Sequence, residues 1–188
     1  MTRFGWWLLL IFAVVIGGFA LIVRQGGGFQ RPASGPAPSA PVSVGGSLIL
    51  PVAGVQVAAL TDTWGQSRGG GAREHHAIDI MAARGTPVLA AAAGTIEKLF
   101  ESADGGHTIY VRRSDPAFVD YYAHLDSYAP DLREGIAVRQ GQTIGAVGST
   151  GSASEEAPHL HYEIKRMQAD EKWYQGTNVN PFPILTGR

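Results

Sequence analysis

The most informative run of residues in this chain is Ala157-Pro158-His159-Leu160-His161-Tyr162-Glu163-Ile164. Apolar side chains alternate with histidines in it, which indicates a short β-strand. Residues two apart on a strand point the same way, so we expect His159 and His161 to share one face and Leu160 and Tyr162 the other. Imidazole is a common zinc ligand and a common general base. By itself, however, the triplet fits a solvated polar face equally well.

Short strands separated by turns are predicted throughout residues 48–188, which we take as one domain. Apolar or β-branched runs lie at 49–52, 86–90, 94–96, 108–112, 118–124 and 143–147. They recur about every ten residues with glycine in the turns, a spacing typical of antiparallel strands. No long amphipathic helix is visible in this part of the sequence. The pattern therefore predicts an antiparallel all-β domain, and roughly 140 residues suffice to bury a single core.

The amino-terminal segment, residues 1–24, is expected to be a transmembrane anchor. Trp6 to Val23 is an uncharged run of 18 residues, long enough to cross a bilayer core of ~30 Å as a helix. A cleaved signal peptide is the alternative, but its apolar core usually has only about 7–15 residues. We favour the anchor, with the amino terminus inside and the large domain outside.

Residues 25–47 are predicted to be a linker. They contain Gly26-Gly27-Gly28 and then prolines 32, 36, 38 and 41 among Ala and Ser. Such a composition cannot bury a core and behaves as a semi-extended tether. The domain at 48–188 would then work near the membrane without entering it.

Charge and cysteine content narrow the classes of partner and of metal site. Residues 48–188 contain 12 Lys/Arg and 16 Asp/Glu, a difference of −4, because Arg3, Arg24 and Arg31 precede them. No basic stripe interleaved with aromatics is present, so we expect no nucleic-acid partner. The chain has no cysteine, so a metal site here must use histidine and carboxylate.

A second cluster, Arg73-Glu74-His75-His76-Ala77-Ile78-Asp79-Ile80, lies upstream. On a strand over 77–81, Ile78 would face the core and Asp79 would point away, on the side of His75. Together with His161, these two residues would supply three ligands to a tetrahedral zinc with its fourth position open. A surface loop ending in an ordinary carboxylate is the alternative interpretation.

A third cluster is Tyr121-Tyr122-Ala123-His124-Leu125, where His124 ends a predicted strand. Strict alternation would put Tyr122 on the same face as His124 and Ala123 on the opposite one. Alone, His124 would be interpreted as an exposed histidine at a strand end. However, five of the six histidines fall within the three clusters, and only His107, to which we assign no role, stands apart. This concentration is typical of a site assembled from distant strands.

Taken in order, the clusters resemble the lysostaphin-type zinc metallopeptidases, that is, the M23 or LytM-like peptidoglycan endopeptidases. The family's H-x-G-[IV]-D, Y-x-H and H-x-H motifs appear here as residues 75–79, 122–124 and 159–161. Residues 85–88, 141–142, 147–151 and 180–183 also match, so the resemblance covers nearly all of 48–188. Two departures are Ala77, where the family usually has Gly, and a longer loop at 152–157 that contains Glu155-Glu156.

The resemblance implies both a fold and a function. The fold would be a two-sheet, sandwich-like arrangement with few helices. His75, Asp79 and His161 would bind one Zn²⁺, and His124 and His159 would be the catalytic histidines. The substrate would be peptide stems or cross-links of peptidoglycan, and the protein would sit in the bacterial cytoplasmic membrane with its domain on the periplasmic side. Protein regulators are further candidate partners, and the oligomeric state is not predicted.

Two other functions are alternatives to the peptidase: a non-catalytic regulator and a carrier domain. Relatives of this family that have lost ligands act as non-catalytic regulators of other wall hydrolases, but here all five residues are present. A lipoyl- or biotinyl-type carrier domain is suggested by 90–96 and 138–144. That fold requires a modifiable lysine at a hairpin tip, and neither segment has one.

Overall fold

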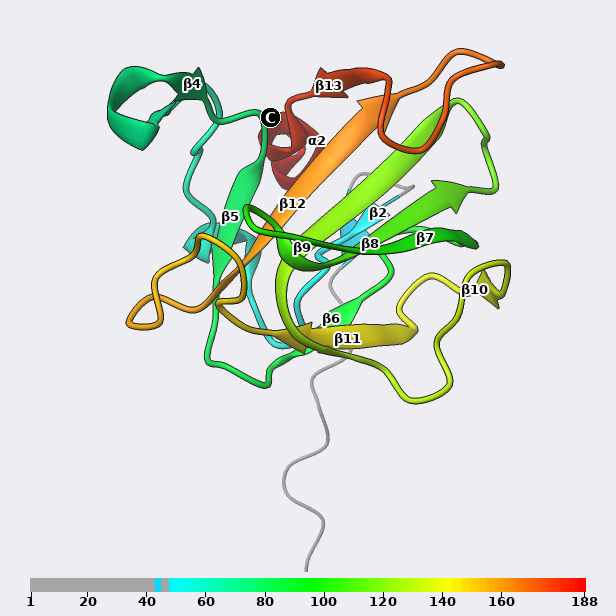
Figure 1. Cartoon of the computed structure of the whole chain (residues 1–188), viewed down its shortest axis with the longest axis horizontal. Coiled ribbons are helices and arrows are strands. Elements are labelled where there is room, and N and C mark those ends of the chain that lie inside the picture. The colour runs from blue at the N-terminus through cyan, green and yellow to red at the C-terminus, as the bar shows by residue number, and fades with distance from the viewer. Residues whose placement is uncertain (1–42, 45–47) are drawn as a thin grey trace, which may run out of the picture. The chain divides into compact units, whose positions relative to one another are not determined.

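The computed structural model describes residues 43–44 and 48–188 (Figure 1). The anchor predicted for 1–24 and nearly all of the 25–47 linker lie outside these residues. Within the described part, no helix is long and apolar enough to cross a membrane. Ser43–Val44 (β1) pairs antiparallel with Leu48–Ile49 (β2) as a separate two-stranded sheet.

Antiparallel strands make up most of the described domain, as predicted. The remaining strands are β3 (Ser67–Arg68), β4 (Arg73–Glu74), β5 (Ile78–Met81), β6 (Pro87–Leu89), β7 (Gly94–Ser102), β8 (Gly106–Arg113), β9 (Phe118–Tyr128), β10 (Ala137–Val138), β11 (Thr143–Val147), β12 (His159–Arg166) and β13 (Thr177–Val179). Helical segments in this part are short: two 3₁₀ turns (Val57–Ala59 and Gly69–Gly71) and α2 (Pro181–Thr186).

The main sheet branches at β9, the longest strand (Figure 1). Its first half, 118–123, pairs with β12, whereas its second half, 125–128, pairs with β11. The strands of one branch follow the order β10-β7-β8-β9-β11-β6. The other branch leaves β9 through β12, which also pairs with β5 and β13. One long strand, β9, thus joins both halves of the expected two-sheet arrangement into a continuous sheet of nine strands in the described part of the chain.

The core lies beneath β12 and follows the predicted alternation. Leu160, Tyr162 and Ile164 are fully buried, and they pack with residues of β5, β8, β9 and β11 in one apolar cluster. Burying such side chains stabilises the fold by about 1.5–3 kcal/mol each. The opposite face of β12 is therefore held in a fixed position above this core.

A buried ion pair supports β12 from the core side. Arg113 Nε and Nη2 donate to the two carboxylate oxygens of Asp120 at 2.9 and 2.5 Å, and Asp120 has no exposed surface. Tyr162 Oη donates to Asp120 Oδ1 at 2.7 Å. Burial, with the charge of Asp120, raises the pKa of Tyr162 well above its ordinary value, so the phenol remains a donor.

Candidate active site

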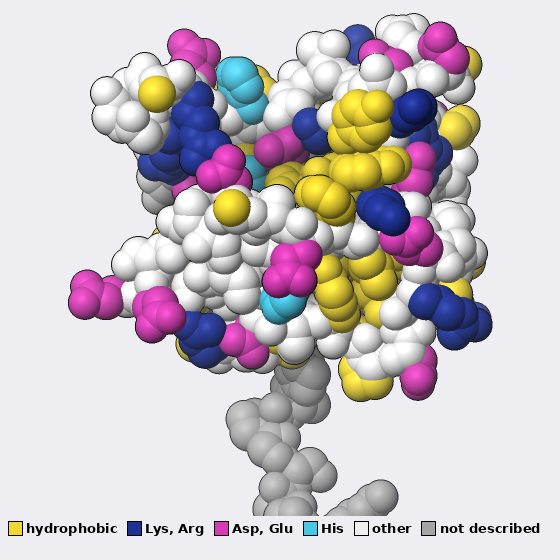
Figure 2. All heavy atoms as spheres, viewed as in Figure 1, with side chains coloured by type: hydrophobic (Ala, Val, Ile, Leu, Met, Phe, Trp, Pro, Cys, Tyr) yellow, Lys and Arg dark blue, Asp and Glu magenta, His cyan; other side chains and the backbone are white. Residues whose placement is uncertain are grey.

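A groove of about 550 Å³ opens over the polar face of β12. Figure 2 shows the surface hollowed between the lobe that bears β4 and the end of β12, with histidine, acidic and basic side chains around the hollow. Strands β4, β5, β9 and β12 and the loop at 152–154 contribute its walls. The three predicted clusters meet in this groove.

Pairing between β5 and β12 brings two of the clusters together. His161 lies directly opposite Asp79 in the antiparallel register, and His159 lies opposite Met81. Ile78 and Ile80 are buried, whereas Asp79 points into the groove. The predicted alternation of both strands is confirmed.

Three donor atoms of His75, Asp79 and His161 form a small triangle. His75 Nε2 lies 3.1 Å from His161 Nδ1 and 3.0 Å from Asp79 Oδ1, and His161 Nδ1 lies 3.3 Å from the same Oδ1. All are sheltered, with side chains 5%, 16% and 17% exposed. This is the group within the described residues whose ligand atoms lie close enough together to hold a metal ion.

The loop residue Thr63 contacts two members of the triangle, His75 and Asp79. His75 Nδ1 lies 2.9 Å from the Thr63 carbonyl oxygen, so this nitrogen carries the proton and Nε2 keeps a free lone pair. The Asp79 backbone N–H donates to Thr63 Oγ1 at 3.0 Å. Arg68 Nη2 lies 2.6 Å from Asp79 Oδ2, which leaves Oδ1 directed at the histidines.

The third member of the triangle, His161, is oriented by Glu163. Its Oε1 lies 3.1 Å from His161 Nε2, so that nitrogen donates and Nδ1 presents its lone pair to the triangle. Lys165 Nζ and Asn178 Nδ2 contact Glu163 Oε2 at 3.0 and 2.9 Å. Carboxylate partners of this kind fix the tautomer of metal-binding histidines.

These residues fit a divalent cation. Two imidazole lone pairs face a carboxylate oxygen, Asp79 Oδ1, that is buried and accepts no hydrogen bond of acceptable geometry from the described residues. Ligand atoms at about 2.0–2.1 Å from a tetrahedral zinc lie roughly 3.3–3.4 Å apart. The edges of 3.0–3.3 Å in this triangle are close to that spacing, and the N₂O donor set suits zinc.

Ionisation of the metal-free site is consistent with its geometry. Burial raises the pKa of Asp79, but close contact with His161 and His75 outweighs it and holds that pKa well below its usual range. Burial lowers the pKa of His161, but Asp79 and Glu163 outweigh it and raise that pKa. Burial also raises the pKa of Glu163, but contacts with His161 and Lys165 outweigh it and lower that pKa to about 2. A positive charge is therefore stabilised inside the triangle.

The side chain of His124 lines the groove, which the alternation of a regular strand does not predict. Its backbone has a positive φ of 60°, an uncommon conformation for a residue other than glycine. Ala123 and His124 both line the groove. Tyr122 is buried in the core, where its hydroxyl oxygen accepts a hydrogen bond from the Ala91 N–H. The expectation that Tyr122 shares a face with His124 was wrong, because the left-handed residue breaks the alternation.

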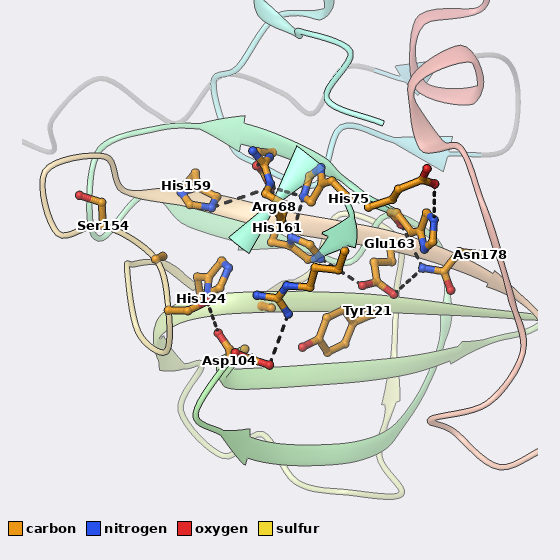
Figure 3. Close-up of a pocket in the computed structure, with 18 of the residues that line it drawn as sticks. Arg68, His75, Asp104, Tyr121, His124, Ser154, His159, His161, Glu163 and Asn178 are labelled. Atoms are coloured by element: carbon orange, nitrogen blue, oxygen red, sulfur yellow. Dashed lines mark hydrogen bonds and ion pairs between the residues drawn. The ribbon is translucent and has the colours of Figure 1, made fainter. Parts of the chain in front are cut away.

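His124 and His159 lie near His161 in the groove (Figure 3). Their ring centroids are 5.0 Å apart. Nδ1 of His124 donates to the Thr150 carbonyl and Nδ1 of His159 to that of Ala157, both at 2.8 Å, which leaves Nε2 free on each ring. His159 Nε2 is 3.8 Å from Asp79 Oδ1. Burial lowers the pKa of His124 to about 4, so this ring is neutral near pH 7.

All five predicted residues therefore line one groove, and further residues join them. Glu163 and Lys165 continue the i+2 series from His161, so strand periodicity alone could have indicated them. Arg68 (β3) and Asn178 (β13) also line the groove, and Thr63 contacts His75 and Asp79 without lining it. The sequence offers no local signal for these three. His107, to which no role was assigned, does not line the groove.

The two departures from the family pattern leave the triangle intact. Ala77 is buried and its φ is not positive, so a methyl group fits without backbone strain. The loop at 152–157 borders the groove through residues 152–154, whereas Glu155 and Glu156 are exposed.

The chain is similar to known proteins over the region that contains the triangle. The sequence model of peptidase family M23 matches residues 73–181. The L-Ala–D-Glu endopeptidase of Bacillus subtilis (strain 168) is 36% identical over 129 residues, which are 65% of this chain and 38% of that protein. The murein hydrolase activator NlpD of Escherichia coli (strain K12) is 33% identical over 128 residues, covering 68% of this chain and 29% of that protein.

A solved structure extends the likeness to the fold. The catalytic domain of the antimicrobial peptidase lysostaphin from Staphylococcus simulans aligns with a TM-score of 0.57 and 31% identity, covering 67% of this chain and 90% of that domain. The chain spans well under half the length of the two curated relatives described above. Their similarity therefore concerns only part of each relative.

Proposed function

Because the chain belongs to peptidase family M23, we propose that it is a zinc-dependent endopeptidase that hydrolyses peptide bonds in the stems or cross-links of bacterial peptidoglycan. The observation that supports this most directly is the triangle of His75, Asp79 and His161, whose donor atoms lie 3.0–3.3 Å apart with free lone pairs inward. Two more histidines with free Nε2 atoms adjoin it. Together they supply a complete set of groups for metal-assisted hydrolysis.

The chemistry divides between the bound ion and the chain's own residues. A zinc ion held by the triangle would supply a Lewis acid that polarises the scissile carbonyl and lowers the pKa of water. His124 and His159 would handle protons at their Nε2 atoms. Each ring donates from Nδ1 to a backbone carbonyl, so each Nε2 is an acceptor in the resting site. The ring that takes a proton from the attacking water can then deliver it to the leaving amine.

A second candidate function is regulation without catalysis. The chain is similar to a murein hydrolase activator, so activation of other wall hydrolases is a real alternative for this fold. Retention of all three metal ligands and both catalytic histidines favours the peptidase. An activator would not need a buried carboxylate oxygen facing two imidazole lone pairs.

The proposal also places the domain at a membrane. The uncharged run at 6–23 and the Gly/Pro-rich residues 25–47 support a single-pass anchor and tether in the bacterial cytoplasmic membrane, with the domain on the periplasmic side. The tether would let the domain work on peptidoglycan close to the bilayer.

Digestion of purified peptidoglycan tests the proposed function. The full chain, loaded with zinc, is incubated with intact wall material, and mass spectrometry identifies the fragments released. We expect new amino and carboxyl termini at one type of peptide bond, and no release after chelation of the metal. Intact wall material after incubation with a protein that holds its zinc would refute the peptidase and leave the activator.

A further inference from the structure

Arg68 occupies a position that the family's motifs do not describe. It lies on β3, lines the groove, and is anchored by the 2.6 Å contact between its Nη2 and Asp79 Oδ2. Its side chain is 35% exposed, so the guanidinium is accessible from the groove. Figure 3 shows it beside His75, His159 and His161. A cation is thus fixed next to the atoms that would do the chemistry.

Most of the hydrogen-bonding capacity of Arg68 is unused. A guanidinium has five N–H donors in a planar fork. Across the described residues, neither Nε nor Nη1 of Arg68 makes a hydrogen bond. Arg73 also has free donors, but its contact with Asp104 is long, at 3.3 Å, and its side chain is 56% exposed. Lys165 Nζ is held by Glu163 and Asn178, both at 3.0 Å. Arg68 is therefore the groove cation with both a fixed position and free donors in this part of the chain.

We propose that Arg68 binds a carboxylate of the substrate close to the scissile bond, an inference that rests on the proposed endopeptidase function. A planar guanidinium matches a carboxylate with two parallel hydrogen bonds. Because Asp79 already holds the guanidinium, little side-chain freedom is lost on binding. The charges of Asp79 and Arg68 cancel each other. A bound dication would therefore leave the site with a net positive charge, which also favours an anion.

The substrate class supplies a suitable group. One relative is named for cleavage of an L-Ala–D-Glu bond. A glutamyl residue linked through one of its carboxyl groups keeps the other as a free carboxylate next to that bond. A peptide ending near the cleavage site offers the same chemistry as a terminal carboxylate. Arg68 would select substrates with a carboxylate at this point over those in which it is an amide.

The rival explanation is that Arg68 only orients Asp79 for the metal. The two roles give different results, because loss of an orienting residue weakens the site for every substrate alike. Loss of a recognition residue instead removes the difference between carboxylate and amide forms. A matched pair of ligands therefore separates them.

Binding is measured by calorimetry on the zinc-loaded full chain carrying His159→Ala, in which cleavage is slow enough for the ligands to stay intact during the measurement. The ligands are synthetic peptides containing an L-Ala–D-Glu bond, in two pairs: free carboxylate against carboxamide on the Glu residue, and free carboxylate against carboxamide at the C-terminus. We expect the carboxylate form of one pair to bind about 10- to 100-fold more tightly, as a charge-assisted pair should. The pair that shows the preference identifies which carboxylate Arg68 recognises.

Adding Arg68→Gln should reduce that preference to within about twofold of unity, and Arg68→Lys should retain part of it. The matched control, Arg133→Gln, removes an exposed arginine outside the groove and should leave the preference unchanged. Equal binding of both forms, or a preference that survives Arg68→Gln, would overturn the inference. Because binding is scored without cleavage, failure of wall digestion would count against the peptidase and not against this site.

Discussion

His75 Nε2 and His161 Nδ1 lie 3.1 Å apart, although 86 positions separate the residues in the chain. Both atoms carry a lone pair, because the other nitrogen of each ring donates to Thr63 or Glu163. Two lone pairs at this distance repel each other unless a proton or a metal ion lies between them. The buried Oδ1 of Asp79 also lies close to both nitrogens, at 3.0 and 3.3 Å. The arrangement is therefore that of a cation site.

Glu163→Gln should weaken zinc binding while leaving the fold in place. The amide can still accept from His161 Nε2, but the negative charge that favours this tautomer and increases the basicity of the ring is lost. We expect the affinity for zinc to fall about 10- to 100-fold, measured by competition with a chromogenic chelator. Glu155→Gln, on the exposed loop, is the control and should leave the affinity unchanged. Equal affinities in the two variants would show that Glu163 does not tune the site.

Zinc affinity should decrease as the pH falls. Asp79 and Glu163 raise the pKa of His161 above its ordinary value of 6.5, so the metal-free protein holds a proton that zinc must displace. The raised pKa stabilises the metal-free fold fully below pH 6.5, and this stabilisation is lost as the pH rises through the raised pKa. Calorimetric titration of zinc at several pH values checks the first statement, and denaturant unfolding in excess chelator checks the second. A zinc affinity independent of pH between about 6 and 8 would contradict the first statement, and an unchanged stability of the metal-free protein over that range would contradict the second.

The positive φ of His124 predicts an unusual order of stabilities. Alanine is strained at φ 60° and glycine is not, so His124→Gly should be more stable to urea than His124→Ala by about 1 kcal/mol. At Glu101, an exposed position of β7 without a positive φ, the order should be reversed. Both His124 variants should lose cleavage. If His124→Ala proves the more stable, the left-handed backbone at this position is not correct.

Strand periodicity predicted much of this architecture because the two faces of β12 and β5 differ sharply in polarity. His159, His161 and Asp79 were placed on the groove side from their spacing alone, and the structure agrees. Branching of the sheet at β9 was not predictable, since it depends on which partner each half of one strand meets.

The site shows where local sequence patterns stop being informative. His124 was identified as a candidate, but its face was predicted wrongly because one left-handed residue reverses the alternation. Arg68 and Thr63 meet Asp79 through long-range packing, across sequence separations of 11 and 16 residues. No periodic signal encodes contacts of that kind. Strand periodicity could have predicted that Glu163 lies on the groove side, since it is two positions beyond His161.

Asp120→Ala should destabilise the domain strongly. It removes the partner of Arg113, whose side chain is only 12% exposed, and the acceptor of the Tyr162 hydroxyl. An unpaired buried charge of this kind costs about 3–5 kcal/mol, to be measured by urea unfolding of metal-free protein. Asp170→Ala, at an exposed position, is the matched control and should change stability by less than about 0.5 kcal/mol. A loss of under about 1 kcal/mol for Asp120→Ala would mean that this ion pair does not support β12.

Zinc content and wall cleavage, measured together in three proteins, test the central claim most directly. The wild-type chain should hold one zinc ion and cut peptidoglycan. His161→Ala should lose both properties, because it removes one of the three donor atoms of the ligand triangle. His159→Ala should keep the zinc but cleave about 10²- to 10⁴-fold more slowly, as expected when a general acid–base group is removed. Undiminished cleavage by His161→Ala, or loss of zinc from His159→Ala, would contradict the assignment of these two histidines to separate roles.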